Sequence, residues 1–302
     1  MSPEEKVAVQ VEGRTLTLSN LAKVLYPETG FTKAEVLSYY QQVAPVLLPH
    51  IANRPLTLKR YPDGVDGQAF FAKHAPDHRP DWIRTVVVHS RSSRARGETV
   101  TYLVVDDLPT LIWVANLAGL ELHAPMWRLP DDGPVPEGEE REPDLLVFDL
   151  DPGLPATIVE CCRVALALRP MLRADGLEPL AKTSGGKGMQ LYASIEGMTA
   201  AQASDLARGY AERLEHDDPK RVTSRMTKSL RTGRVFIDWS QNNGKKTTVA
   251  PYSLRARENP TVSTPLTWDE VAACKETSDL FFTAEDLPAR ITEHGDLFAL
   301  LL

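Results

Sequence analysis

A run of apolar residues that ends in two alternating aspartates constrains the fold of this chain more than any other feature. In Leu145–Pro152, LLVFDLDP, the four leading apolar residues predict a buried strand, and Pro-Gly ends it. Residues i and i+2 of a strand face the same side, so Asp149 and Asp151 project together. Neighbouring carboxylates resist ionising unless a cation such as Mg²⁺ or Mn²⁺ lies between them. The alternative is a solvated strand end, since Asp-Pro-Gly is also turn chemistry.

A third aspartate lies within a second apolar string, Val235–Trp239. A buried carboxylate without a partner is costly, so Asp238 needs a cation or hydrogen-bond donors. Three aspartates on adjacent strands could hold two ions about 4 Å apart, which suits in-line phosphoryl or nucleotidyl transfer. A salt bridge from Asp238 to Arg231 or Arg234 is the competing interpretation.

A glycine-rich string, TSGGKG at Thr183–Gly188, lies between two predicted strands, Glu178–Lys182 and Gln190–Ile195. Glycines let backbone N–H groups approach a ligand, while Ser184 adds a hydroxyl and Lys187 a positive charge, as in a phosphate cradle. The string does not match the P-loop pattern, and a plain hairpin turn accounts for it equally well.

Charge is spread very unevenly. The formal net charge of −7 over 302 residues, taken alone, argues against a protein that binds nucleic acid. Lys220–Arg257, however, contains ten Lys or Arg residues and one acid, a net charge of +9, whereas residues 258–302 carry nine acids and two bases. A charge run is usually a solvated face, but this one surrounds Asp238 and favours a polyanionic substrate near the aspartates.

Strands and helices alternate along the chain, which predicts an α/β or α+β protein. Capping boxes at Thr32–Glu35 and Thr199–Gln202 open two predicted helices, and a third is predicted over Ile158–Leu172. Two further strands are predicted over Pro55–Tyr61 and Val100–Val105.

An acidic connection with several prolines and glycines, residues 130–143, divides the chain. We expect one domain over residues 1–302, with an N-terminal sub-module of about residues 1–129 and a catalytic sub-module over residues 144–302. No signal peptide and no membrane span are predicted. Cys161, Cys162 and Cys274 form no C-x-x-C pair, which fits a reducing cytoplasm.

Strings along nearly the whole chain, from about residue 14 to residue 300, resemble the polymerase domain of bacterial ligase D, a member of the archaeo-eukaryotic primase superfamily. They are LSNLAKVLYPETGFTK, RPLTLKRYPDG, AFFAKH, LELHAP, FDLDPG, TSGGKGMQLY and MTKSLRTGRVFIDWSQNNGKKTTVAPYSLRAR. The resemblance implies an α+β fold of the archaeo-eukaryotic primase type, with central mixed or antiparallel sheets flanked by helices. The active site would lie at strand ends between the two sub-modules. The ligase and nuclease modules of full ligase D are not found, so we expect a stand-alone chain.

The resemblance also implies roles for individual residues. Two Mn²⁺ or Mg²⁺ ions would be held by the catalytic residues Asp149, Asp151 and Asp238. The incoming nucleotide would be bound by Lys59, His123, Ser184, Lys187, Gln190 and Arg255. A DNA 5′-phosphate would be bound by Asn20, Lys23 and Lys33. Phe70 and Phe71 would stack on the template, with core packing as their alternative, and Arg231 would help organise the aspartates from a mobile loop.

One position departs from the resemblance. The family usually has histidine in the string GLHLY, where this chain has Gln190 in GMQLY. A neutral amide can donate to a phosphate but cannot act as a cation or proton donor in the same way. We expect activity to persist, because the three aspartates, Lys187 and Arg255 remain.

The function implied is that of a template-directed nucleotidyltransferase, a DNA-dependent DNA/RNA primase-polymerase. It would fill short gaps or extend broken DNA ends in repair, as in non-homologous end joining, and would prefer ribonucleotides over deoxyribonucleotides. Its partners would be DNA with a gap, overhang or recessed 5′-phosphate, a Ku-type end-binding protein and a separate DNA ligase. We expect a cytoplasmic, nucleoid-associated monomer that does not bind membranes.

Two alternatives remain open at the level of sequence. The first is a DNA-end-binding module that has lost activity, for which Gln190 is the support. The second is a Mg²⁺-dependent phosphohydrolase of the haloacid-dehalogenase type, with Asp149 as nucleophile and Asp151 as acid or base. Pro152 weakens the second alternative, because that family has glycine there.

Overall fold

The computed structural model describes residues 6–89, 99–130 and 142–302. Most of the predicted acidic connection, residues 131–141, lies outside the described residues. Each of the strands predicted from sequence, and the helix predicted over Ile158–Leu172, is present within two residues of its expected bounds.

Six strands, mostly from the first half of the chain, form the first sheet. They are β5 (Pro55–Arg60), β6 (Phe70–Ala72), β7 (Thr85–His89), β8 (Thr99–Val104), β9 (Gly119–Ala124) and β15 (Thr248–Val249). The order is β15-β9-β5-β8-β7, with β6 also paired to β5, and all these pairings are antiparallel. Because β15 comes from far along the chain, the C-terminal half completes the N-terminal sheet.

Six strands from the second half of the chain form the second sheet. They are β10 (Leu145–Pro152), β11 (Leu180–Thr183), β12 (Met189–Ser194), β13 (Val222–Thr223), β14 (Val235–Asp238) and β16 (Pro265–Leu266). The order is β13-β14-β10-β12-β11-β16, with β13 and β14 parallel and the other pairings antiparallel. The predicted mixed and antiparallel sheets are therefore confirmed.

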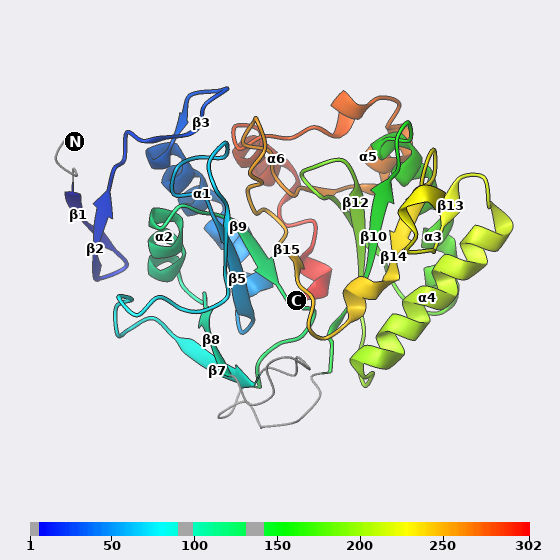
Figure 1. Cartoon of the computed structure of the whole chain (residues 1–302), viewed down its shortest axis with the longest axis horizontal. Helices are drawn as coiled ribbons and strands as arrows, with labels where there is room; N and C mark the ends of the chain where they lie inside the picture. Colours follow the sequence, from blue (N-terminus) through cyan, green and yellow to red (C-terminus); the bar gives the residue numbers. More distant parts are fainter. Residues whose placement is uncertain (1–5, 90–98, 131–141) are drawn as a thin grey trace.

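Helices flank the two sheets. They are α1 (Lys33–Ile51), α2 (Leu108–Asn116), α3 (Ile158–Ala174), α4 (Ala200–Asp217), α5 (Trp268–Ala273) and α6 (Leu287–His294). In Figure 1, α1 and α2 lie on the outer side of the first sheet, and α3 and α4 lie on the outer side of the second. Two small hairpins precede α1: β1 (Lys6–Val11) with β2 (Arg14–Ser19), and β3 (Val24–Tyr26) with β4 (Phe31–Thr32).

The predicted start of α1 is confirmed. Thr32 accepts a hydrogen bond from the Glu35 backbone N–H, and the Glu35 side chain accepts one from the Thr32 backbone, which together form the capping box. Val36, Tyr40 and Leu47, at helical spacing, are fully buried against the first sheet. Thr199 and Gln202 form the same arrangement at the start of α4.

Helix α2 was missed by the sequence patterns. It is buried on nearly all sides, so apolar residues recur without the 3.6-residue period that marks an amphipathic helix. Asp107, which accepts a hydrogen bond from the Thr110 N–H, is the local signal that marks its start.

Two hydrophobic cores correspond to the two sheets. The first packs α1 and α2 on the first sheet and also takes in Tyr252, Leu254 and Val262 from the C-terminal half. The second packs α3 and α4 on the second sheet. The chain crosses between the two cores more than once, and the sub-module boundary at residues 130–143 stays a prediction. Among the described residues, no helix is long and apolar enough to span a membrane.

Candidate active site

The three predicted catalytic aspartates lie together on two neighbouring strands of the second sheet. Asp149 and Asp151 are on β10, and Asp238 ends β14. Strands β10 and β14 pair so that Asp149 lies directly opposite Asp238. Directly opposed residues on one face have Cβ atoms roughly 5 Å apart. The register of the sheet therefore gathers carboxylates from separate strings into one cluster.

The carboxylates of this cluster repel one another. Burial raises the pKa of the Asp149 carboxyl to about 7, and the charges of Asp151 and Asp238 add to that rise. Burial and the Asp238 charge also raise the pKa of Asp151, while Arg231 opposes the rise. Carboxylates held together against their own repulsion gain most from a cation placed between them.

Amide side chains hold Asp149 in place. Gln190 Nε2 lies 3.0 Å from one carboxylate oxygen and Gln241 Nε2 lies 3.3 Å from the other. Gln241 was missed from sequence, because it follows β14 in a 3₁₀ turn whose position depends on the sheet. Gln190 is buried behind Asp149, where it contacts the Asp149 carboxylate.

Asp238 has its own set of partners. Its Oδ1 accepts hydrogen bonds from the Ser240 N–H at 3.0 Å and from the Ser240 hydroxyl. Among the described residues, Asp238 forms an ion pair with Lys246 at 3.8 Å. The competing interpretation expected Arg231 or Arg234 as the partner.

The donor chemistry fits a hard divalent cation, since ionised carboxylates on adjacent strands are oxygen ligands that Mg²⁺ and Mn²⁺ prefer. Within residues 6–89, 99–130 and 142–302, however, no group of three or more His, Cys, Asp or Glu side chains is arranged to hold an ion. The Asp149 and Asp238 oxygens instead accept hydrogen bonds from Gln190, Gln241 and Ser240. Each carboxylate oxygen has more than one lone pair, so these hydrogen bonds orient the carboxylates and leave lone pairs for an ion.

The glycine loop between β11 and β12 packs against the strand that carries Asp149 and Asp151. A Cβ on Gly188 would lie 2.2 Å from the Leu150 carbonyl oxygen, so only glycine allows this approach. The Ser184 hydroxyl accepts hydrogen bonds from the Gly186 and Gly188 N–H groups. Lys187, between them, is exposed. The predicted hairpin is present and lies beside the aspartates, while its role as a phosphate cradle stays a prediction.

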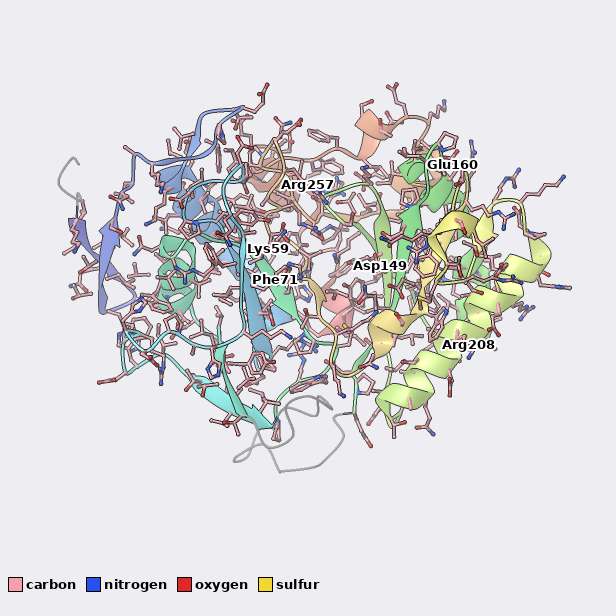
Figure 2. All side chains as sticks on the ribbon, viewed as in Figure 1. Lys59, Phe71, Asp149, Glu160, Arg208 and Arg257 are labelled. Atoms are coloured by element: carbon pink, nitrogen blue, oxygen red, sulfur yellow. The ribbon has the colours of Figure 1, made fainter. Side chains whose placement is uncertain are left out.

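Two arginines from the segment that follows β15 lie against this loop. Arg255 Nη1 donates to the Ser184 carbonyl oxygen at 2.7 Å. Arg257 was not among the predicted site residues, yet its Nη2 lies 3.0 Å from where a Cβ of Gly186 would stand. Figure 2 labels Arg257 near the loops between the two sheets.

A buried acid, Glu121, lies close to three of the predicted nucleotide-binding residues. Its carboxylate lies 2.9 Å from His123 Nε2, 3.4 Å from Arg255 Nε and 3.8 Å from Lys59 Nζ. It also accepts a hydrogen bond from the Ala256 N–H at 3.1 Å. Glu121 is 2% exposed. Since Arg255 contacts both Glu121 and the glycine loop, it connects the first sheet with the second.

The charge of Glu121 is strongly stabilised. Burial alone would raise its pKa, but the hydrogen bond from His123 and the charges of Arg255, His123 and Lys59 outweigh that effect and lower the pKa to about 2. Sequence reasoning missed this residue. The available signal was its place in LELHAP, where Leu120 and Leu122 alternate with Glu121 and His123 across the two faces of a strand.

The two predicted template-stacking residues are exposed. Phe70 is 46% and Phe71 66% exposed on β6, which rejects core packing for this pair. Phe71 lies beside the cation cluster, with its ring 6.2 Å from that of His123 and 5.6 Å from Lys59 Nζ. In Figure 2, Lys59 and Phe71 lie together on the first sheet, while Asp149 lies on the second.

The three residues predicted to bind a 5′-phosphate lie together at the N-terminus of α1. The Lys33 N–H donates to the Lys23 carbonyl oxygen, and the Lys23 N–H donates to that of Asn20. Lys33 is buried, with Nζ 2.6 Å from the Ser19 carbonyl oxygen. Lys23 is more exposed and forms an ion pair with Asp63 at 3.0 Å.

Arg231 lies at the open end of β10 and β14. Its guanidinium stacks on the Phe236 ring at 3.6 Å, and its Nη2 donates to the Met226 carbonyl oxygen. Gly153 makes this possible, because a Cβ there would lie 2.0 Å from the Arg231 carbonyl oxygen. Arg231 is thereby held close enough to Asp151 for its positive charge to oppose the rise in the pKa of the Asp151 carboxyl.

Repelling carboxylates at strand ends, a glycine loop with the exposed Lys187 and a cluster of basic side chains together define a nucleotidyltransferase-type site. Such a site transfers the α-phosphate of a nucleoside triphosphate to a hydroxyl and releases pyrophosphate. The chain belongs to the LigD primase-polymerase domain family, whose model, described as "LigD, primase-polymerase domain", matches residues 32–298.

Individual relatives agree with that family. The chain is 46% identical over 283 residues to the multifunctional non-homologous end joining protein LigD of Mycolicibacterium smegmatis, covering 93% of this chain and 35% of that protein. It is 29% identical over 282 residues to the bifunctional non-homologous end joining protein LigD of Bacillus subtilis, covering 93% and 43%. The chain thus spans about a third of the length of its mycobacterial relatives.

A solved structure is similar over nearly its whole length. The polymerase domain of Mycobacterium tuberculosis ligase D, in complex with DNA, matches with a TM-score of 0.86 and 43% identity, covering 95% of this chain and 97% of that one. The predicted resemblance, the α+β fold and the nucleotidyltransferase class are therefore confirmed. Neither the inactive binding module nor the phosphohydrolase is favoured.

Proposed function

We propose that this chain performs template-directed, metal-dependent nucleotide addition at DNA gaps and broken ends during end joining. The observation that carries the proposal is the register that sets Asp149 opposite Asp238, beside a glycine loop that Arg255 ties to the cation cluster around Glu121. This arrangement supplies negative charge for divalent cations and positive charge for a triphosphate within one site.

Asp149, Asp151 and Asp238 are the residues that would hold Mg²⁺ or Mn²⁺. Such ions lower the pKa of an attacking hydroxyl and neutralise the charge that develops on the leaving pyrophosphate. Around them, Ser184 and Lys187 would bind the triphosphate oxygens, and Arg255 would bind them from the opposite side. Lys59 and His123 would complete the pocket toward the base and sugar. Arg231 would orient Asp151.

The DNA would lie across the exposed aromatic and basic surfaces. Phe70 and Phe71 offer π-faces on which any template base can stack. Asn20, Lys23 and Lys33 would hold a 5′-phosphate at the start of α1, where helix N–H groups favour an anion. The similar Mycobacterium tuberculosis domain, solved in complex with DNA, supports this assignment. A preference for ribonucleotides, a monomeric and nucleoid-associated state, and cooperation with a Ku-type protein and a ligase complete the proposal.

A primer-extension panel tests this function. It compares gapped, overhanging and unprimed DNA, ribonucleotides and deoxyribonucleotides, and Mg²⁺ and Mn²⁺. We expect template-matched addition on gapped and overhanging DNA, with ribonucleotides added faster. Binding to these DNAs without any incorporation under any of these conditions would instead establish the inactive module.

The 5′-phosphate assignment predicts opposite effects for two neighbouring substitutions. Lys23→Ala should weaken binding to gapped DNA with a 5′-phosphate about tenfold, since a hydrogen bond to a charged group contributes roughly 1.5–3 kcal/mol. Asp63→Asn should strengthen it by a few-fold, because the exposed Lys23–Asp63 pair competes with the phosphate at a cost of about 0.2–1 kcal/mol. Fluorescence anisotropy measures both affinities.

The matched control is the same DNA without its 5′-phosphate. On that DNA both variants should bind like the unsubstituted protein. Equal losses on both DNAs for Lys23→Ala would show that Lys23 contributes only general positive charge.

A further inference from the structure

A straight row of side chains crosses the second sheet at right angles to its strands. Lys182 on β11 lies opposite Gln190 on β12, Gln190 lies opposite Asp149 on β10, and Asp149 lies opposite Asp238 on β14. Directly opposed residues of antiparallel strands share one face of a sheet, so each of these four side chains lies beside the next one in the row. The row runs from a lysine through an amide to the two aspartates.

Hydrogen bonds link the first three members. Lys182 Nζ lies 2.7 Å from Gln190 Oε1, and Gln190 Nε2 lies 3.0 Å from Asp149 Oδ1. The Tyr192 hydroxyl also lies 3.1 Å from Gln190 Oε1. The same hydroxyl lies 2.9 Å from Thr248 Oγ1 and has one proton to donate, so Lys182 is the donor that holds the amide oxygen, and the amide presents its NH₂ group to Asp149. Lys182 thus fixes which end of Gln190 faces the carboxylate.

Lys182 is an unusual residue to bury. It is 0% exposed, and no carboxylate forms a salt bridge with it in the described part of the chain. Its other hydrogen-bond partner is the Ser263 hydroxyl at 2.6 Å, which can only accept here because it donates to the Thr183 carbonyl oxygen. Burial and the charge of Arg255 lower the pKa of Lys182 well below its ordinary value, because a buried ammonium without a direct counterion is costly. A fold tolerates such a cost most readily at a functional site.

We propose that Lys182 and Gln190 act as one positioning unit, in which the buried lysine orients the amide and the amide holds the Asp149 carboxylate ready for a divalent cation. Gln190 stands at the position where that family usually has histidine. This inference rests on the proposed metal-dependent function, and it identifies Lys182 as a residue that acts through Gln190 rather than on the substrate.

Lys182→Met separates this role from a structural one. Gln190 Oε1 keeps the Tyr192 hydroxyl at 3.1 Å and Ser263 keeps its bond to Thr183, so both groups retain a hydrogen-bonding neighbour. Because it also removes a buried amine that has no direct counterion, the melting temperature of the metal-free protein should stay unchanged or rise. Affinity for Mn²⁺ alone, measured by calorimetry without DNA or nucleotide, should fall about tenfold, as for other residues that orient metal ligands.

Gln190→Leu and the double variant test whether the two residues form one unit. Gln190→Leu should also lower Mn²⁺ affinity about tenfold, and Lys182→Met combined with it should lower the affinity no further. Gln190→His should retain the affinity, since one ring nitrogen can accept from Lys182 while the other donates to Asp149. Lys275→Met, at an exposed lysine remote from this row, is the matched control.

Additive losses in the double variant, or a Mn²⁺ affinity of Lys182→Met within about twofold of the unsubstituted protein, would overturn the proposal. A melting temperature that falls while Mn²⁺ affinity is unchanged would assign Lys182 a purely structural role. These measurements need no primer extension. If the unsubstituted protein binds Mn²⁺ but extends no primer, the proposed function fails while the positioning unit can still be established.

Discussion

Asp149→Asn should reduce nucleotide incorporation about a thousandfold or more. Asp149 is the central carboxylate of the cluster, opposite Asp238 and two residues from Asp151. Charge stabilisation by bound metal ions contributes several kcal/mol to such a transition state, and each 1.36 kcal/mol is tenfold in rate. Single-nucleotide extension of a gapped primer with Mn²⁺ measures the loss.

Asp217→Asn is the matched control for this variant, because it removes the same charge from an exposed aspartate at the C-terminal end of α4. Its extension rate should equal that of the unsubstituted protein. Should Asp149→Asn keep more than about a tenth of the activity, a loss far smaller than the several kcal/mol expected of a metal ligand, Asp149 would not be one.

Glu121→Gln should have the second largest effect, on both stability and nucleotide affinity. The pKa of Glu121 is lowered from 4.5 to about 2 by His123, Arg255 and Lys59, against the effect of burial. At 1.36 kcal/mol per unit, its ionised form contributes roughly 3 kcal/mol to the free energy of unfolding at neutral pH. Without that charge, Lys59, His123 and Arg255 lose their common partner, so the KM for nucleotide should rise about tenfold.

The pH dependence distinguishes this effect from a general loss of packing. A carboxyl whose folded pKa is depressed stabilises the protein above its unfolded pKa, near 4.5, and loses that contribution as the pH falls through about 2. The difference in unfolding free energy between the unsubstituted protein and Glu121→Gln should therefore be largest above pH 5 and shrink toward pH 2. Urea unfolding at a series of pH values measures it.

Glu212→Gln is the control for Glu121→Gln, because Glu212 pairs with Arg208 on the exposed surface of α4, where an ion pair contributes little. Its effect on stability should be small at every pH. A stability difference for Glu121→Gln that stays constant from pH 7 to pH 3 would show that volume or polarity at this position matters and its charge does not.

Local patterns in the sequence were sufficient for the elements that carry the chemistry. Alternation along β10 placed Asp149 and Asp151 on one face, and the glycines of residues 183–188 marked the hairpin beside them. Capping boxes marked the starts of α1 and α4. These features depend on residues a few positions apart, which is why they can be read without a fold.

Contacts between distant strings could not be derived in that way. Glu121 and Arg255 are separated by more than a hundred residues, and their contact depends on the packing of β9 against the segment after β15. The buried position of Lys182 was equally hidden, since a lysine before a glycine loop is ordinarily a surface charge.

By itself, the sequence determined which residue types are available for catalysis and on which face of its own element each one lies, because period and capping are local properties of the backbone. Only the tertiary structure decided which of them meet. The register of β11, β12, β10 and β14 aligned Lys182, Gln190, Asp149 and Asp238 in one row. Strand pairing is fixed by the burial of whole sheet faces, and that burial depends on the entire chain.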